Sequence, residues 1–216
     1  MSNNILKSVG AGSSTRFTTL LESLQFDNKL IRELPIDSET RIFARKVQNC
    51  IFSKVHPTAV VNPQLISFSP AALSLLGLPS SKSGYMDLPA NGSPSLDSLT
   101  KSLERYFSGN AILPGSDPMA HVYCGHQFGS FSGQLGDGAA ILLGEVSINI
   151  VDGKIPERWE IQLKGAGPTP FSRGSDGRKV LRSSVREFLC SEAMYGLGIA
   201  TTRAGTVITS DSRVVR

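Results

Sequence analysis

Three kinds of residue in the segment 133–194 could together hold a phosphate group. Gly136 and Gly138 flank an aspartate, Lys164 ends a stretch of alternating apolar and polar residues, and Glu187 lies in an amphipathic stretch. Glycines let backbone N–H groups approach phosphate oxygens, and a lysine supplies a positive charge that a carboxylate can hold in place. The order glycine-rich turn, strand, tight turn, lysine strand, loop and glutamate helix predicts a site for a nucleoside triphosphate.

Two strands and one helix are expected to position these residues. Residues 140–146 are mainly apolar, a reversal follows at 151–153, and residues 158–164 alternate between apolar and polar. This period of two places Lys164 on the polar face, beside the glycine-rich turn if the two strands pair. The stretch 179–195 carries an apolar stripe at helical spacing that begins at Leu181, and Gly196 is a stop signal.

The carboxylate of Glu187 has two possible kinds of partner. It lies at the edge of the apolar stripe, from which it could reach Lys164 on the neighbouring strand and hold that ammonium at a phosphate. It could instead be an exposed helix residue that pairs with Arg182 or Arg186. The spacing alone leaves both open.

Two common phosphate-binding motifs do not fit the sequence. GDG at 136–138 is not GxGxxG, and GxxxxGK[ST] is absent. A dinucleotide-binding turn would lead directly into a helix, whereas this turn leads into a strand. The order of the elements favours the upper lobe of a protein-kinase-like nucleotide site.

The chain before this unit is expected to form a flexible segment and an extension. Residues 1–27 have little periodicity and no acidic residue before Glu22, which resembles a weak transit peptide. In the extension, 28–132, a short helix is expected that Ser69 caps and Gly77 ends. A loop is expected at 79–95. An amphipathic helix with core contacts is expected to contain Leu99 and Leu103.

Two further expectations concern the glycine-rich segment and the end of the chain. Tyr123, Phe128 and Phe131 stand among glycines at 121–138, a pattern in which aromatic side chains would pin sharp bends. Residues 205–209 and 214–215 are expected to form one hairpin or two short strands.

Composition restricts the class of protein. The 216 residues are 40% hydrophobic and 19% charged, with a net charge of +4, and the positive residues are dispersed, which disfavours nucleic-acid binding. Three widely spaced cysteines give no disulfide framework and favour a reducing compartment. His121, Cys124 and His126 have no fourth ligand at usable spacing, which favours packing over metal binding. No apolar run is long enough to span a membrane.

Three long stretches carry a family resemblance. GHQFGSFSGQLGDGAAILLGE, QLKGAGPTPFSRGSDGRKVLRSSVREFLCSEAM and the earlier VHPTAVVNPQLISFSPAALSLLGL resemble the selenoprotein O family of protein adenylyltransferases, over residues 28–216. The resemblance implies an atypical kinase fold that binds ATP in a flipped orientation and transfers AMP to Ser, Thr or Tyr hydroxyls of proteins. ATP and Mg²⁺ are the implied cofactors, and protein substrates are the implied partners.

The resemblance also implies roles for individual residues. Lys164 matches the family's ATP-phosphate lysine and Glu187 its helix partner, while Gly136 and Gly138 match the nucleotide loop. A second nucleotide-contacting pair is matched by Asp176 and Gly177.

Several departures from the family pattern are also visible. Ala139 stands where many members have arginine after GDG. The family's catalytic aspartate, its two metal-binding residues and two further phosphate-binding arginines would follow Arg216, and the C-terminal selenocysteine or cysteine of some members is absent. No catalytic or metal-binding residue is therefore assigned within the 216 residues.

The expected fold class is α+β: a kinase-like N-lobe at 133–216, with an antiparallel sheet and a glutamate-bearing helix, preceded by the extension and without a C-lobe. The expected function is the nucleotide-binding part of a protein adenylyltransferase, inactive as this chain. The alternatives are a non-catalytic interaction module and conventional phosphoryl transfer. A mitochondrial location is expected, with the cytoplasm as the alternative, and the oligomeric state is left open.

Overall fold

The computed structural model describes residues 20–78, 96–148 and 157–215. The helices and strands, in chain order, are α2 (Lys29–Glu33), β1 (Ile36–Asp37), β2 (Phe52–Lys54), β3 (Gln64–Phe68), α3 (Pro70–Ser74), α4 (Leu96–Phe107), β4 (Met119–Gln127), β5 (Ser130–Gly136), β6 (Ala140–Ile148), β7 (Glu157–Lys164), α5 (Leu181–Gly196) and β8 (Thr206–Thr209). The expected α+β class with a mostly antiparallel sheet is confirmed.

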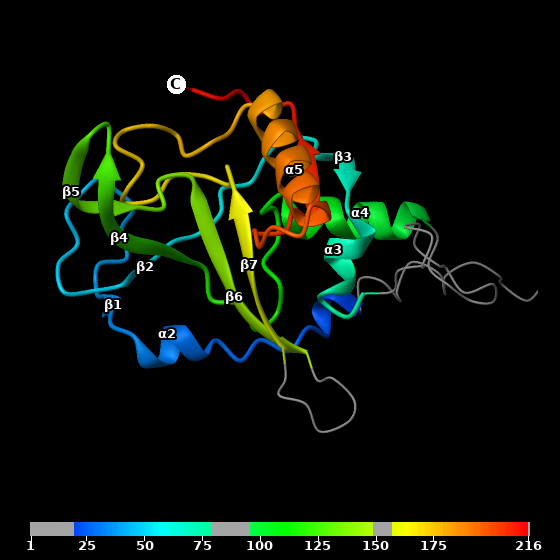
Figure 1. The fold of residues 1–216 in the computed structure, drawn as a ribbon, viewed down its shortest axis with the longest axis horizontal. Coiled ribbons are helices and arrows are strands. Elements are labelled where there is room, and N and C mark those ends of the chain that lie inside the picture. Colours follow the sequence, from blue (N-terminus) through cyan, green and yellow to red (C-terminus); the bar gives the residue numbers. More distant parts are fainter. Residues whose placement is uncertain (1–19, 79–95, 149–156, 216) are drawn as a thin grey trace, which may run out of the picture.

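One six-stranded sheet forms the centre of the molecule (Figure 1). Its order is β1-β2-β4-β6-β7, with β5 paired to β4, and every pair is antiparallel except β1 with β2. Strands β1, β2 and β4 come from the segment 28–132, and β6 and β7 come from 133–216. The two segments expected from the sequence therefore share one sheet.

The main core lies between the sheet and helix α4. Leu99 and Leu103 of α4 are fully buried, as are Ile141 on β6 and, nearly so, Ile161 and Leu163 on β7. The alternation expected in 158–164 and the core contacts of the amphipathic helix are thus confirmed. The short helix expected after Ser69 is present as α3. The Ser69 side chain caps it by accepting a hydrogen bond from the Ala72 N–H.

Two local expectations are wrong. The segment 119–136 forms the hairpin of β4 and β5, but Phe128 at its tip is 95% exposed and Phe131 is 61% exposed, so these rings do not pin the bends. At the end of the chain, β8 pairs with the distant strand β3, and residues 214–215 form no strand. The cause is tertiary pairing: the partner of β8 lies about 140 residues earlier in the chain.

The described residues begin inside the segment 1–27. Leu21 is fully buried in the main core and Phe26 bridges to Val146 on β6, so residues 20–27 pack against the rest of the chain, which differs from the expected flexible boundary. The loop expected at 79–95 and the reversal expected at 151–153 lie outside the described residues. Within the described ranges, no helix is long and apolar enough to cross a membrane.

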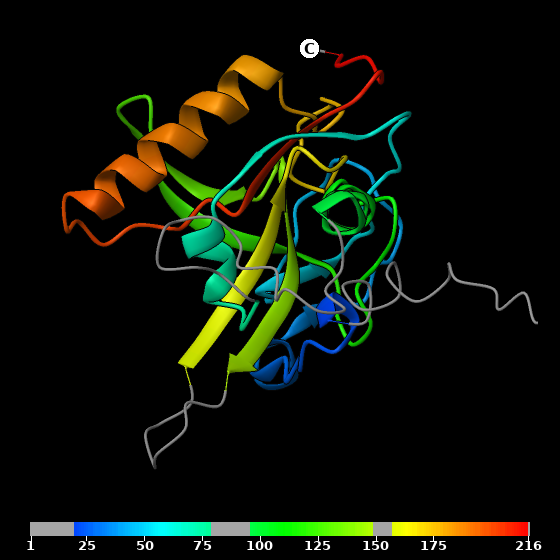
Figure 2. The same ribbon diagram turned by 90° about the vertical axis from the view of Figure 1, so that its right-hand side faces the viewer.

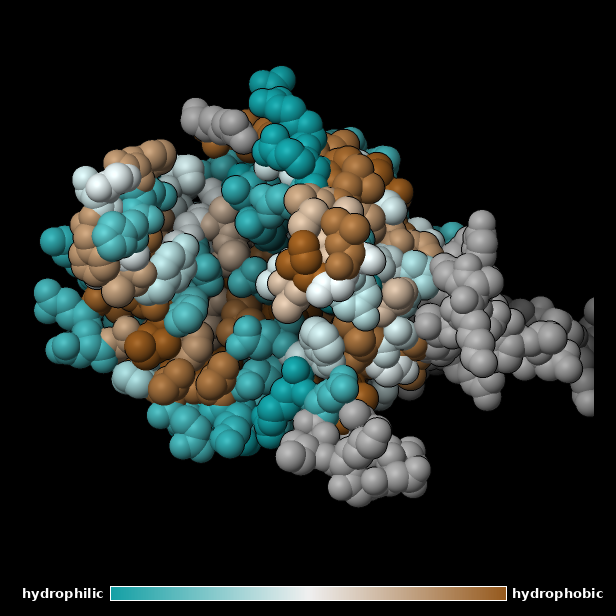
Figure 3. Space-filling model, in the orientation of Figure 1, coloured by the Kyte–Doolittle hydropathy of each residue, from teal (hydrophilic) through white to brown (hydrophobic). Residues whose placement is uncertain are grey.

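Helix α5 lies beside the end of β7 (Figures 1 and 2). It begins at Leu181 and ends at Gly196, close to the expected 179–195. Its apolar stripe is not buried, since Leu181 is 40% exposed and Leu189 62% exposed. Apolar side chains therefore reach the surface around this helix, as the hydropathy view also shows (Figure 3).

Candidate nucleotide-binding site

Lys164 and Glu187 meet at the end of the sheet. Lys164 is the last residue of β7 and pairs with Ala140, which follows the glycine-rich turn at the start of β6. Its Nζ lies 2.7 Å from Oε2 of Glu187 on α5, and the two side chains are 50% and 44% exposed. The structure therefore favours Lys164 over the arginines Arg182 and Arg186 as the partner of Glu187. An ion pair this exposed contributes little stability, about 1 kcal/mol at most.

The turn Gly136-Asp137-Gly138 joins β5 to β6 and packs tightly against Phe171. A Cβ atom at Gly136 would lie 2.3 Å from the Phe171 ring, and one at Gly138 would lie 2.7 Å from the Phe171 carbonyl oxygen. Real Cβ atoms essentially never approach so closely. Close packing thus requires glycine at both positions, independently of any ligand.

Two buried hydroxyl groups fix the carbonyls of this turn. The Thr169 Oγ1 donates to the carbonyl of Asp137 at 2.7 Å, and the Ser172 Oγ donates to the carbonyl of Gly138 at 2.6 Å. Thr169 is 2% exposed and Ser172 8% exposed. No role was predicted from the sequence for either residue, although both lie in the segment GPTPFSR at 167–173, because no periodic pattern distinguishes them.

The N–H groups of the turn already have acceptors within the protein. The Asp137 N–H donates to the His121 carbonyl at 2.9 Å, and the Gly138 N–H donates to the Gly136 carbonyl at 2.9 Å. A phosphate bound by the Gly138 N–H would replace that contact. The expected cradle of free N–H groups is therefore only partly available in this conformation.

The side chain of Asp137 points back toward β4. Burial raises the pKa of its carboxyl group, while the N–H of His121, which donates to it at 3.2 Å, and the positive charge of Lys164 act in the opposite direction. Burial also raises the pKa of Glu160, which lies on the same face of β7 as Lys164, and the negative charge of the nearby Glu145 raises it further. The polar face of the sheet thus disfavours negative charge at these carboxylates.

Asp176 and Gly177 lie directly against the chain that follows Lys164. Gly177 has φ +67°, and a Cβ atom there would lie 1.9 Å from the Gly167 carbonyl oxygen. Asp176 accepts hydrogen bonds from the Arg178 N–H at 2.9 Å and the Val215 N–H at 2.5 Å. The structure brings this second pair to the end of β7, with the Asp176 carboxylate engaged by backbone groups.

A small cavity of about 260 Å³ opens at the glycine-rich turn. It is lined by Gly136, Gly138, Ala139, the Phe171 loop and Tyr123 of β4. Lys164 and Glu187 do not line it. Gly136 and Gly138 therefore line this cavity, whereas the Lys164–Glu187 ion pair lies outside it. The pairing of β6 with β7 still places the glycine-rich turn near the ion pair.

The residues considered for a metal site contact rings instead. The His121 ring lies 5.2 Å from the Phe52 ring, and the His126 ring lies 5.3 Å from the Phe131 ring, both centroid to centroid. Cys124 is an exposed free thiol. In the part of the chain that the structure describes, no three His, Cys, Asp or Glu side chains are grouped so that they could hold a metal ion.

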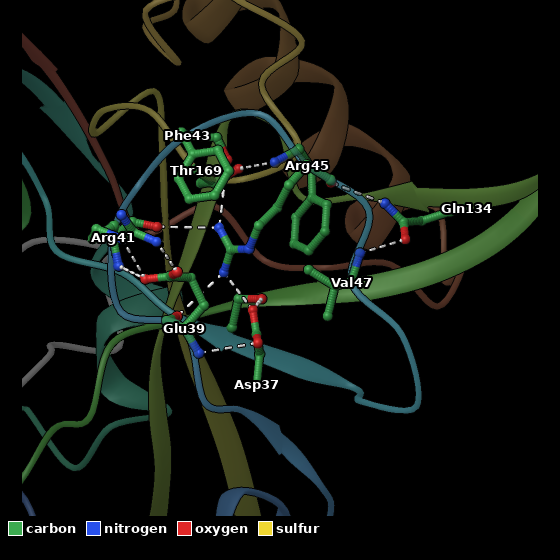
Figure 4. Close-up of polar contacts among 10 residues, drawn as sticks. Asp37, Glu39, Arg41, Phe43, Arg45, Val47, Gln134 and Thr169 are labelled. Carbon is green, nitrogen blue, oxygen red and sulfur yellow. Dashed lines mark hydrogen bonds and ion pairs between the residues drawn. The ribbon is translucent and has the colours of Figure 1, made fainter.

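A strap, defined as residues 37–47, follows β1 and contacts Gln134 on β5 (Figure 4). The Arg45 guanidinium forms an ion pair with Asp37 and lies 5.1 Å from the centre of the Phe43 ring. The backbone N–H of Arg45 donates to the Pro170 carbonyl at 3.3 Å. Gln134, two residues before Gly136, accepts from the Val47 N–H at 2.8 Å and donates to the Arg45 carbonyl at 3.3 Å. The strap was not selected from the sequence.

Comparison with known proteins finds relatives that are named nucleotidyltransferases. It is 47% identical over 196 residues to the protein nucleotidyltransferase YdiU of Azoarcus sp. strain BH72, covering 91% of this chain and 34% of that protein. The family model described as protein adenylyltransferase SelO matches residues 93–216. The chain belongs to the SelO protein adenylyltransferase family.

Animal relatives are also similar over most of this chain. It is 51% identical over 202 residues to the mitochondrial protein adenylyltransferases SelO of Mus musculus and of Homo sapiens. In both cases the match covers 91% of this chain and 28% of the relative. The chain thus spans less than a third of the length of these relatives.

Proposed function

We propose that this chain forms the nucleotide-binding part of a kinase-like protein adenylyltransferase, which transfers AMP from ATP to Ser, Thr or Tyr hydroxyls of proteins. The observation that carries the proposal is the 2.7 Å contact between Lys164 on a strand end and Glu187 on a helix, next to the glycine-rich turn. Membership of the SelO family supports adenylyl transfer over other uses of such a site. The half-exposed ammonium of Lys164 is open to a ligand.

The chemistry assigns each group a limited role. An acceptor hydroxyl oxygen forms a bond to the α-phosphorus of ATP, the bond from that phosphorus to the bridging oxygen breaks, pyrophosphate leaves, and the hydroxyl proton goes to a base. Lys164 holds phosphate oxygens, and Glu187 keeps its ammonium in place. Burial of negative charge is already unfavourable at Asp137, so a bound phosphate would raise the pKa of that carboxyl further. The described residues offer no group of three His, Cys, Asp or Glu side chains that could hold Mg²⁺.

ATP binding by the 216-residue chain tests the site. Lys164→Ala should weaken binding of ATP, measured by calorimetry, by about tenfold or more, because a charge-assisted contact to phosphate is lost. Lys101→Ala is the matched control, because Lys101 on α4 forms a similar exposed pair with Asp97 at 2.9 Å. Equal loss of affinity in the two variants, or no ATP binding by the unaltered chain, would contradict the proposed site.

Labelled ATP distinguishes the reactions. With a protein acceptor and a full-length SelO-family relative, α-labelled ATP should transfer label in a manner that depends on the lysine matching Lys164, whereas γ-labelled ATP should not. Transfer from γ-labelled ATP alone would indicate conventional phosphoryl transfer. Transfer from neither, with no ATP binding, would indicate a non-catalytic interaction module.

We also propose a mitochondrial location, supported by the names of the mouse, zebrafish and human relatives. Bacterial relatives named YdiU show that the family is not confined to mitochondria. Fractionation of cells that express the chain with a C-terminal tag should recover it with mitochondria. Recovery in the cytosol would contradict this proposal.

A further inference from the structure

Helix α5, which carries Glu187, is attached to the rest of the molecule mainly by polar contacts. Its apolar side chains are largely open, with Leu189 62% exposed and Tyr195 52% exposed. The Lys164 contact near the middle of the helix is itself half exposed. Burial of apolar surface therefore contributes little to the orientation of this helix, and other contacts must fix it.

Glu192 is the centre of the strongest polar attachment. Its carboxylate accepts hydrogen bonds from Arg203 Nε at 2.8 Å and Nη2 at 2.7 Å, from the Ser69 Oγ at 2.7 Å, and from the Ala204 N–H at 3.2 Å. The two contacts from Arg203 are the bidentate arrangement that planar guanidinium and carboxylate groups favour. These contacts tie α5 to the chain before β8 and to the start of α3.

The groups around Glu192 are well enclosed. The Arg203 side chain is 6% exposed and the Glu192 side chain 22% exposed, compared with 50% for Lys164. The Tyr195 ring covers the guanidinium at 3.6 Å. The hydrogen bond from Arg203 is the main cause that lowers the pKa of Glu192 to about 2. The pair is therefore ionised and held at neutral pH.

Glu192 and Glu187 are five positions apart on one helix, about 7.5 Å along its axis. A helix transmits a fixed orientation over so short a distance. We propose that the Glu192–Arg203 pair, completed by Ser69, is a positioning anchor that orients α5 so that Glu187 meets Lys164. Its consequence for ATP rests on the proposed function, whereas its consequence for the Lys164–Glu187 contact does not.

Zero-length carbodiimide coupling measures this contact without ATP. The reagent converts the Glu187 carboxyl group to an O-acylisourea, the Lys164 amine attacks its carbonyl carbon, and a urea leaves. The resulting amide bond is quantified by mass spectrometry of a digest. Coupling between Lys101 and Asp97, at 2.9 Å on α4, is the internal reference. Glu192→Gln should lower the Lys164–Glu187 yield at least threefold relative to that reference, and Arg203→Lys, which keeps the charge but not the fork, should lower it less.

The variants must remain folded for this test. A cooperative melt and an unchanged Lys101–Asp97 yield establish that. If Glu192→Gln does not fold, Ser69→Ala, which removes one of the four contacts, takes its place. An unchanged relative yield in a folded variant would overturn the anchor.

ATP affinity separates this proposal from the proposed function. Glu192→Gln should weaken ATP binding in the unaltered chain but not in a Glu187→Gln chain, because the anchor acts through Glu187. An equal loss of affinity in both chains would indicate general destabilisation and would overturn the anchor. A lowered coupling yield with unchanged ATP affinity would support the anchor and contradict the proposed role of Glu187.

Discussion

Arg45 is expected to stabilise the molecule far more than the arginine four positions earlier in the same strap. Its guanidinium binds Asp37 and the carbonyls of Glu39, Arg41 and Phe43 (Figure 4). The Arg45 and Asp37 side chains are only 12% and 14% exposed. Removing one partner of a fully buried ion pair costs about 3–5 kcal/mol, so we expect Arg45→Met to lower the free energy of unfolding by about 3 kcal/mol.

Arg41→Met is the matched control. The Arg41 side chain also pairs with a carboxylate, Glu39, but it is 78% exposed, so its loss should change the free energy of unfolding far less. Urea unfolding followed by circular dichroism measures both variants at pH 7. A difference between the two variants below about 1 kcal/mol would refute the reasoning from burial.

The pH dependence gives a second check on the same pair. Burial alone would raise the pKa of Asp37, but hydrogen bonds from the Glu39 N–H, Arg45 and Ser53 outweigh it and lower the pKa from 3.8. A carboxyl group with a lowered pKa stabilises the fold above its unfolded value, and this contribution is lost as the pH falls through the folded value. The difference between the unaltered chain and Arg45→Met should therefore be complete at pH 7 and shrink below about pH 4.

Two further substitutions test the loops of the candidate site. Gly177→Ala should lower the free energy of unfolding by about 3 kcal/mol or more, because φ is +67° at this position and the new Cβ atom would overlap the Gly167 carbonyl. Gly174→Ala is the control, with φ +83° but no atom within 4 Å of the new Cβ atom, and should cost only about 1–2 kcal/mol. Urea unfolding of both variants therefore separates steric overlap from backbone strain. Asp137→Asn should stabilise the chain at pH 7, because a raised carboxyl pKa means that ionised Asp137 costs stability, and this gain should vanish as the pH falls below about 4 in thermal melts. A constant gain at all pH values would contradict that cause.

The parts of the site that could be predicted are those with a local signal. Alternation in 158–164 predicted Lys164 on the polar face, beside the glycine-rich turn if that strand paired with 140–146. The structure contains this pairing and places Lys164 opposite Ala140. The helical stripe gave the position of Glu187, although the choice between Lys164 and an arginine needed the structure. Periodicity of two and 3.6 residues carries this information because it depends only on neighbouring residues.

The supporting contacts have no such signal. Thr169 bonds to a carbonyl 32 residues away, and Glu192 bonds to a serine 123 residues away. Isolated Ser, Thr, Glu and Arg residues are common, and only the folded chain shows which of them are buried together. The same reason explains the error at β8, whose partner β3 is distant in the sequence.

The burial of these groups separates two roles within the site. The pair that we propose to meet ATP is half exposed, while its supports, Thr169, Arg203 and Arg45, are almost completely enclosed. Removing one partner of an exposed ion pair costs little stability, whereas removing one partner of an enclosed ion pair or hydrogen bond costs much more, because the other group is left buried and unpaired. Substitution of Lys164 should therefore change ligand binding at nearly constant stability, whereas substitution of a support should change stability and, through the geometry of α5 or the glycine-rich turn, binding as well.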